Sequence, residues 1–186
     1  MSMYKNIFIT GPPGSGKSTL LMGIVRELEA RNIKVRGIVC PEVRRGRSRW
    51  GFRVVVYPDG VEEVLASVDI RSGPRVSKYR VNVDGFEKVG VVALEDSLRN
   101  PDIRVILIDE IGKMELFSRR FRDVVVRILE SDKVVLGVLG RVRDPLVSSI
   151  RRRRDTLIVE LRYNMSDKDR VLVKERILNS ILSVVL

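Results

Sequence analysis

The run from Gly11 to Thr19 has the residue types and the spacing of a phosphate-binding loop. It fits the pattern G-x-x-x-x-G-K-[ST] without a mismatch. Glycines allow the backbone to fold around phosphate oxygens, and the N–H groups at the start of the following helix attract an anion. The residues predicted to contact a nucleotide here are Gly11, Pro12, Pro13, Gly14, Ser15, Gly16, Lys17, Ser18 and Thr19.

Two side chains at the end of this loop have roles that follow from their chemistry. Lys17 is expected to reach the β- and γ-phosphates as a catalytic cation, and the Ser18 hydroxyl is expected to ligate Mg²⁺. The apolar run Ile7–Ile9 before the loop and the helical pattern after it supply the strand and helix that such a loop needs. The alternative is a Gly- and Pro-rich loop that only turns the chain.

Two carboxylates form the second candidate group. The largely apolar run from Ile103 to Ile108 ends in Asp109 and Glu110. Such a run is typical of a strand buried on both faces in a parallel sheet, and its carboxyl end would lie beside the phosphate loop. We expect Asp109 to hold Mg²⁺, directly or through water, and Glu110 to polarise an attacking water. A surface Asp-Glu pair is the alternative.

Three arginines are candidates for contact with the γ-phosphate. Arg141 and Arg143 follow the apolar run Val134–Leu139, and Arg44 opens the basic stretch Arg44–Arg49 after an earlier strand. Positive charge at these strand ends would stabilise charge on the γ-phosphate in the transition state. Each arginine could equally be solvated, and Arg44–Arg49 is interpreted either as a basic loop over the triphosphate or as a charged turn.

The elements that position these residues alternate between strand and helix. A βαβ unit at the start predicts a parallel sheet, and Tyr57–Val61 has the turn signal of an inserted antiparallel β-hairpin. The predicted strands are 4–10, 35–40, 50–57, 61–66, 103–110, 134–139 and 156–160. The predicted helices are 17–31, 84–99, one capped by Ser118, one begun by Pro145 and one capped by Ser166. We expect one domain over residues 1–186.

Composition restricts the chemistry further. The chain has 186 residues, a single cysteine, Cys40, and no histidine. A Cys/His metal site, an intrachain disulfide and a histidine-based triad are therefore excluded, and any metal must take oxygen ligands, as Mg²⁺ does. No apolar run approaches the ~20 residues of a membrane span, and strand one begins directly after the N-terminus. We expect a cytoplasmic protein without a membrane segment.

The net charge of +11 favours anionic partners. Nucleotides or nucleic acid would fit, and a charged surface of the kind found in thermophiles is the alternative. The run Arg151–Arg154 is interpreted as a solvated face or as a contact with a nucleic-acid backbone.

The block Asp109–Leu116 reads Asp-Glu-Ile-Gly-Lys-Met-Glu-Leu. Together with Gly11–Ser18 it resembles the thermophilic, or cancer-related, nucleoside-triphosphatase family. The other segments that resemble this family are Glu42–Arg44 with Gly51–Arg53, Val81–Val83 with Phe86-Glu87, and Phe117-Ser118 with Phe121-Arg122.

This resemblance implies a RecA-like P-loop NTPase fold, in which a mainly parallel sheet is flanked by helices. It also implies slow, Mg²⁺-dependent hydrolysis of nucleoside 5′-triphosphates with broad base tolerance, so that ATP, GTP, CTP and UTP are all candidate substrates. Gly112 and Lys113 lie in the matching block and are carried over as nucleotide-site residues.

Two other functions share the same loop and fold. A nucleotide or small-molecule kinase would need a second pocket for an acceptor, and a nucleic-acid-dependent ATPase would use the arginine-rich stretches. A monomer is expected in each case.

Overall fold

The computed structural model describes residues 4–186. Its strands are β1 (Asn6–Thr10), β2 (Val35–Val39), β3 (Glu42–Arg45), β4 (Ser48–Tyr57), β5 (Glu62–Ser67), β6 (Arg75–Val76), β7 (Tyr79–Val81), β8 (Val105–Ile111), β9 (Val134–Leu139) and β10 (Thr156–Glu160). Its helices are α1 (Lys17–Glu29), α2 (Val83–Phe86), the π-helix η1 (Glu87–Val91), α3 (Val92–Arg99), the 3₁₀ helix η2 (Glu115–Phe117), α4 (Arg119–Glu130), α5 (Pro145–Arg152) and α6 (Asp167–Val185).

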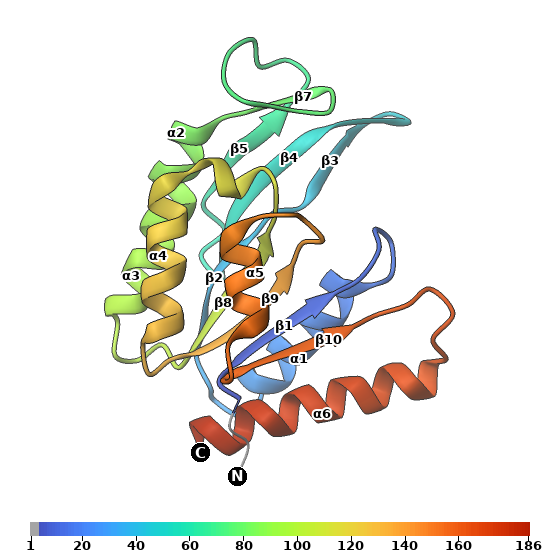
Figure 1. The fold of residues 1–186 in the computed structure, drawn as a ribbon, viewed down its shortest axis with the longest axis vertical. Helices are drawn as coiled ribbons and strands as arrows, with labels where there is room; N and C mark the ends of the chain where they lie inside the picture. Colours follow the sequence, from blue (N-terminus) through green and yellow to red (C-terminus); the bar gives the residue numbers. More distant parts are fainter. Residues whose placement is uncertain (1–3) are drawn as a thin grey trace.

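A single ten-stranded sheet runs through the molecule in the order β10-β1-β9-β8-β2-β4-β5-β7-β6, with β3 paired to β4 (Figure 1). The strands from β10 to β2 are all parallel, whereas β4 and the strands beyond it pair antiparallel. The predicted parallel sheet and its antiparallel extension are thus both present. All carboxyl ends of the parallel half meet at one edge, where the candidate residues were expected.

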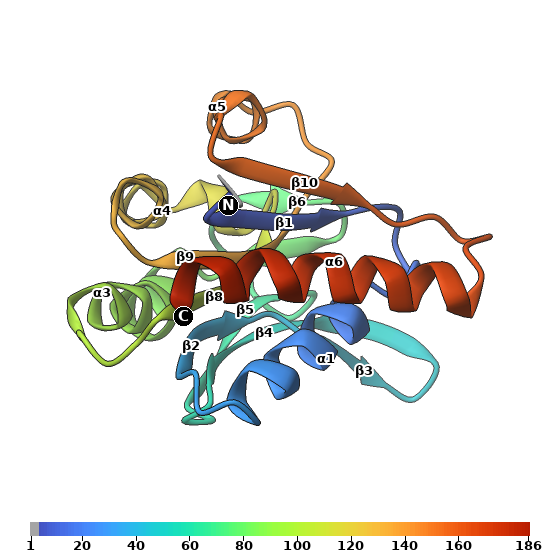
Figure 2. The ribbon, with the colours of Figure 1, turned by 90° about the horizontal axis from the view of Figure 1, so that it is seen from below.

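Helices cover both faces of the parallel half. Figure 2 shows α1 and α6 together on one face, with α3, α4 and α5 on the other. Successive residues of β1 point to opposite faces, so Ile7 and Ile9 join the core under α1 and α6 while Phe8 joins the core under the other helices. All three are fully buried. This double burial explains why these strands read as continuous apolar runs.

Two of the predicted helix starts are confirmed by their capping geometry. The Ser118 hydroxyl accepts a hydrogen bond from the Phe121 N–H at 2.9 Å, at the start of α4. The Ser166 hydroxyl accepts one from the Asp169 N–H at 3.1 Å, at the start of α6. Both hydroxyls satisfy a backbone donor that has no partner within its helix.

Of the two interpretations of Arg44–Arg49, the structure favours the charged turn, because this stretch is the end of a β-hairpin. β3 and β4 pair through Arg45 and Ser48, and Gly46 has the positive φ of 61° that a tight hairpin turn favours. β3 is almost entirely exposed and therefore lacks the apolar alternation that marks a strand in a sequence. The small hairpin formed by β6 and β7 was missed because strands of two and three residues are too short to show a periodic pattern.

The predicted helix 84–99 begins one residue earlier and is not uniform. Asn82 caps it, since its side chain accepts a hydrogen bond from the Gly85 N–H at 3.0 Å. The middle of the segment, Glu87–Val91, is π-helical. The first helix ends at Glu29 rather than at Arg31, and Asn32 takes the left-handed φ of 58°. Among residues 4–186, no helix combines the length and the apolar character needed to cross a membrane.

Gly37 permits the close approach of β2 and β8. A Cβ atom at this position would lie 1.9 Å from the carbonyl oxygen of Leu107, its partner in the ladder. We therefore expect Gly37→Ala to lower the free energy of unfolding by about 1–3 kcal/mol, because the backbone of β8 must move. Denaturant unfolding followed by circular dichroism measures this change.

The matched control is Gly23→Ala in α1. A Cβ atom there would meet only the end of the flexible Lys174 side chain, at 3.7 Å. Since alanine is the better helix former, this variant should be about 0.5–1 kcal/mol more stable than the native chain. Equal stability of both alanine variants would contradict the close contact of β2 with β8.

Candidate active site

The loop between β1 and α1 has the backbone conformation that its glycines allow. Gly14 and Gly16 have positive φ angles of 75° and 90°, and α1 begins at Lys17 directly after Gly16. No side chain of the described residues caps this helix. The N–H groups of its first turn are therefore open to an external acceptor, which is the arrangement that binds anions at helix N-termini.

The C-terminal part of the chain braces this loop. Arg170 of α6 donates from Nη1 to the carbonyl oxygen of Ser15 at 2.8 Å, and the Tyr163 hydroxyl donates to the carbonyl oxygen of Pro13. Sequence reasoning missed both residues, because the contacts join positions 155 and 150 residues apart in the chain. No local pattern marks a side chain that acts at such a separation.

Lys17 lies at the mouth of the loop. Its Nζ donates to the carbonyl oxygens of Gly11 and Pro12, at 3.0 and 2.9 Å. The Lys17 ammonium thus bridges two carbonyl groups at the start of the loop. Its positive charge is held next to the predicted phosphate position.

Ser18 and Asp109 meet across the sheet edge. The Ser18 hydroxyl donates to Asp109 Oδ2 at 2.8 Å, although 91 residues separate the two in the chain. Burial raises the pKa of Asp109, while the hydrogen bond from Ser18 and the positive charge of Lys17 act in the opposite direction. The two predicted metal ligands therefore lie within hydrogen-bond distance of each other.

The donor set at this position fits Mg²⁺. It consists of a hydroxyl and a carboxylate, both oxygen ligands. Within residues 4–186, no group of three or more cysteine, aspartate or glutamate side chains is arranged to hold a metal ion. This suits an ion that takes one or two protein ligands and completes its coordination with water and substrate phosphates.

Glu110 lies beside the same pair. Burial raises its pKa, the negative charge of Asp109 adds to this, and Lys17 opposes it. Gly112 makes room for its carboxyl group: a Cβ atom on Gly112 would lie 2.8 Å from Glu110 Oε1 and 3.1 Å from Glu115 Oε2. Gly112 therefore contributes to the site by leaving room, since a side chain at this position would displace the carboxyl groups of Glu110 and Glu115.

Glu115 is a buried acid that sequence reasoning did not assign. Only 4% of it is exposed, at the start of η2. Burial, with the negative charge of Glu110 as the next cause, raises its pKa from 4.5 to about 8. It also shares a hydrogen bond with the thiol of Cys40. An acidic residue inside an otherwise apolar helical pattern was the available signal.

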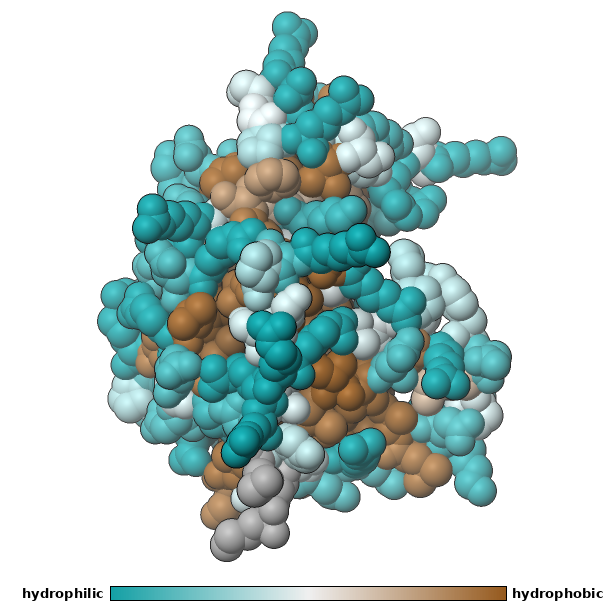
Figure 3. Space-filling model, in the orientation of Figure 1, coloured by the Kyte–Doolittle hydropathy of each residue, from teal (hydrophilic) through white to brown (hydrophobic). Residues whose placement is uncertain are grey.

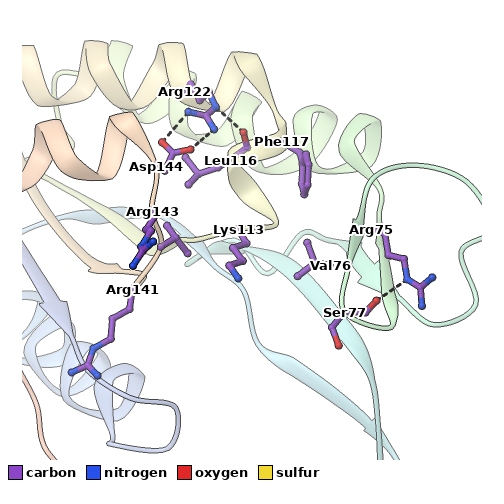
Figure 4. Close-up of a pocket in the computed structure, with 11 residues that line it drawn as sticks. Arg75, Val76, Ser77, Lys113, Leu116, Phe117, Arg122, Arg141, Arg143 and Asp144 are labelled. Atoms are coloured by element: carbon purple, nitrogen blue, oxygen red, sulfur yellow. Dashed lines mark hydrogen bonds and ion pairs between the residues drawn. The ribbon is translucent and has the colours of Figure 1, made fainter.

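The structure brings together only two of the three predicted arginines, because Arg141 and Arg143 line one cavity and Arg44 does not. Arg44 pairs with Glu42 at 2.6 Å on the β3–β4 hairpin, and Figure 3 shows the surface hollowed between this hairpin and the lobe that carries the loop. Arg141 pairs with Glu160 at the end of β10. Arg143 is exposed and lies with Arg141 and Lys113 on this cavity, whose lining includes no residue of the phosphate-binding loop (Figure 4).

Comparison with known proteins agrees with this geometry. The model of the NTPase family matches residues 6–181. The chain belongs to the NTPase family. This NTPase is 42% identical over 178 residues to the nucleoside-triphosphatase THEP1 of Thermotoga maritima, with 96% of this chain and 94% of that protein covered. It is 43% identical over 152 residues to the protein of the same name from Korarchaeum cryptofilum, covering 82% and 77%.

Two solved structures share the fold of the NTPase. THEP1 from the hyperthermophile Aquifex aeolicus superposes with a TM-score of 0.78 at 36% identity, covering 95% of this chain and 98% of that one. A human cancer-related nucleoside triphosphatase superposes with a TM-score of 0.77 at 34% identity, covering 96% and 98%. The family and the α/β P-loop fold expected from the sequence are both confirmed.

The raised pKa of Glu115 predicts a dependence of stability on pH. The folded chain keeps a proton that the unfolded chain releases between pH 4.5 and about 8. The free energy of unfolding should therefore fall as the pH rises through this window. Glu115→Gln is uncharged at every pH, so it should flatten this fall. Thermal unfolding at several pH values, with EDTA present, measures the slope.

Asp109 and Glu110 also have raised pKa values. The free energy of unfolding of Glu115→Gln should therefore still fall with pH, but with a smaller slope than that of the native chain. The control is Glu175→Gln, an exposed acid on α6, which should keep the native slope. Parallel slopes for the native chain and Glu115→Gln would contradict the buried, protonated state of Glu115.

Proposed function

We propose that this NTPase hydrolyses nucleoside 5′-triphosphates to nucleoside diphosphate and phosphate, with Mg²⁺ as cofactor and broad tolerance for the base. The observation that carries the proposal is the 2.8 Å contact between Ser18 and Asp109, which joins the phosphate-binding loop to a buried carboxylate. The curated relatives named nucleoside-triphosphatase support the same reaction.

The phosphates take the place that the loop prepares for them. Backbone N–H groups from Gly14 onward and the open start of α1 hold their oxygens. Lys17 exchanges the carbonyl oxygens of Gly11 and Pro12 for phosphate oxygens. Ser18 and Asp109 would hold Mg²⁺, and the ion would supply positive charge that stabilises the phosphates.

Glu110 orients the attacking water. The water oxygen bonds to the γ-phosphorus as the bond from that phosphorus to the bridging oxygen breaks, and the diphosphate leaves with the electron pair. Glu110 lies next to Asp109, accepts the hydrogen bond of the water and takes the proton that the water loses as its oxygen bonds to phosphorus. Since burial raises its pKa, it is a stronger base than an exposed glutamate when it is ionised.

Tolerance for the base follows from what the loop recognises. Its donors are backbone N–H groups, a lysine and a serine, all of which address phosphate or metal. Such contacts are the same for ATP, GTP, CTP and UTP, so the reaction centre has no preference among the bases.

The arginine-rich stretches give limited support to a nucleic-acid-dependent activity. Arg44 and Arg49 both pair with Glu42, while Arg45 pairs with Asp69 and stacks 4.3 Å over the Trp50 ring. Glu42 and Asp69 thus offset part of the charge of this stretch, and the offset part contributes less to the attraction of a polyanion. In the second stretch, Arg153 is held by Asp155 and Glu130.

A panel of phosphate-release assays tests the proposed reaction. We expect release from all four nucleoside triphosphates with Mg²⁺, loss of release when EDTA replaces Mg²⁺, and no need for an acceptor or for RNA. Release that requires an added acceptor would favour a kinase. Release that rises with RNA and falls with salt would favour a nucleic-acid-dependent ATPase.

Glu110→Gln tests the water-orienting carboxylate. The amide keeps the shape of the side chain but cannot act as a base, so we expect turnover to fall about 100-fold or more. The affinity for a Mg²⁺-nucleotide, measured by calorimetry, should change little. Glu175→Gln is again the control and should keep native turnover. Native turnover in Glu110→Gln would remove this residue from the mechanism.

A further inference from the structure

A cavity of about 650 Å³ lies beside the reaction centre and outside the phosphate-binding loop. Its walls come from Arg75–Ser77 of the β6–β7 hairpin, from Lys113, Leu116 and Phe117 after β8, from Arg122 of α4 and from Arg141–Asp144 after β9. It includes no residue of Gly11–Thr19 and neither Asp109 nor Glu110. The volume is that of a small-molecule site, which typically measures about 300–1,000 Å³.

The cavity carries uncompensated positive charge. Lys113 and Arg143 line it, and neither has an ion pair or hydrogen-bond partner through its side chain in the described part of the chain. The one carboxylate of the lining, Asp144, is already bound by both nitrogens of Arg122 at 3.0 and 2.7 Å. Since Asp144 is occupied, the charge of Lys113 and Arg143 is open to an external anion.

The same cavity offers a flat apolar surface. Phe117 is 46% exposed, which is unusual for phenylalanine in a core-facing segment, and Val76 and Val142 lie on the same lining. Figure 4 shows Phe117 and Lys113 directed into one open space, with Arg75 and Ser77 across from them. An aromatic ring beside free cations is suited to a ligand that joins a planar ring to an anion.

We propose that this cavity is a second binding site, which takes a nucleoside monophosphate. Lys113 and Arg143 bind the phosphate, and the base stacks on Phe117. Two free cations match the charge of one phosphomonoester, whereas a triphosphate needs the loop and Mg²⁺. Lys113 and Arg143, which the sequence placed on the triphosphate, thereby belong to a different ligand. The site does not depend on the hydrolysis proposed above.

Calorimetry on the whole chain tests the second site. The protein is first saturated with Mg²⁺ and a non-hydrolysable ATP analogue, and AMP, GMP, CMP and UMP are then titrated separately. One further equivalent of at least one monophosphate should bind. Lys17→Ala, which weakens the triphosphate site, should keep monophosphate binding. Displacement of the analogue by the monophosphate, with no second equivalent, would overturn the proposal.

Variants of the lining test the assigned contacts. Phe117→Ala should weaken monophosphate binding about tenfold, the effect expected for the loss of one stacked base. Lys113→Glu should abolish it. The controls are Val126→Ala, an equally exposed apolar residue on α4, and Arg151→Glu on α5, and both should bind as the native chain does.

Two further titrations identify other ligands. Inorganic phosphate that binds as tightly as the monophosphates, unaffected by Phe117→Ala, would overturn the role of the base. A short RNA that binds through Lys113 when no monophosphate does would overturn the choice of a small ligand. Phosphate release is recorded for each variant, so loss of hydrolysis is distinguished from loss of the second site.

Discussion

The common direction of β10, β1, β9, β8 and β2 is the constraint on which the site depends. Parallel strands bring their carboxyl ends to one edge, so the loops that leave neighbouring strands must lie near one another. Ser18 and Asp109 meet at that edge although β9 lies between their strands. The helices on both faces make this arrangement possible, because they bury most residues of the parallel strands and leave the carboxyl ends of the strands as the open side.

Burial at this edge sets the chemistry of the carboxyl groups. Burial raises the pKa of Asp109, Glu110 and Glu115, the charge of Asp109 raises the pKa of Glu110 further, and the charges of Glu110 and Asp109 raise that of Glu115. Only Lys17 and Ser18 oppose this among the causes that act on Asp109. Three acids without equal compensation are costly, and a divalent cation with the phosphates of a substrate would relieve part of that cost at Asp109 and Glu110. Glu115, which is almost fully buried, avoids the cost of a buried charge by keeping its proton.

Some of the positive charges of the chain are paired with carboxylates, whereas others are free to attract an anion. Much of it is neutralised locally, as in the β3–β4 hairpin, where Glu42 and Asp69 hold Arg44, Arg49 and Arg45. The cavity behind the reaction centre differs, because its carboxylate is already engaged by Arg122 and leaves Lys113 and Arg143 open. The net charge of +11 therefore says less about partners than the grouping of unpaired cations such as Lys113 and Arg143 on one cavity.

The sequence alone determined the parts of the structure that depend on local rules. The phosphate-binding loop, the buried strands and the helix caps at Ser118 and Ser166 follow from residue type and spacing, so they were predicted at nearly their observed bounds. Asp109 and Glu110 were found in the same way, because the apolar run of a strand buried on both faces stops where the strand reaches the sheet edge. The exposed strands β3 and β6 escaped prediction, since strands without a buried face have no periodic pattern.

Only the tertiary structure decided which distant residues act together. It set Tyr163 and Arg170 against the loop, engaged Arg141 with Glu160, and gave Glu115 its burial beside Glu110. It also placed Lys113, Arg143 and Phe117 on the lining of one cavity that includes no residue of the loop. These outcomes depend on the order of the strands and on the packing of the loops that connect them. Neither the strand order nor the loop packing can be predicted from a local stretch of sequence, because the whole fold decides which side chains meet at a sheet edge.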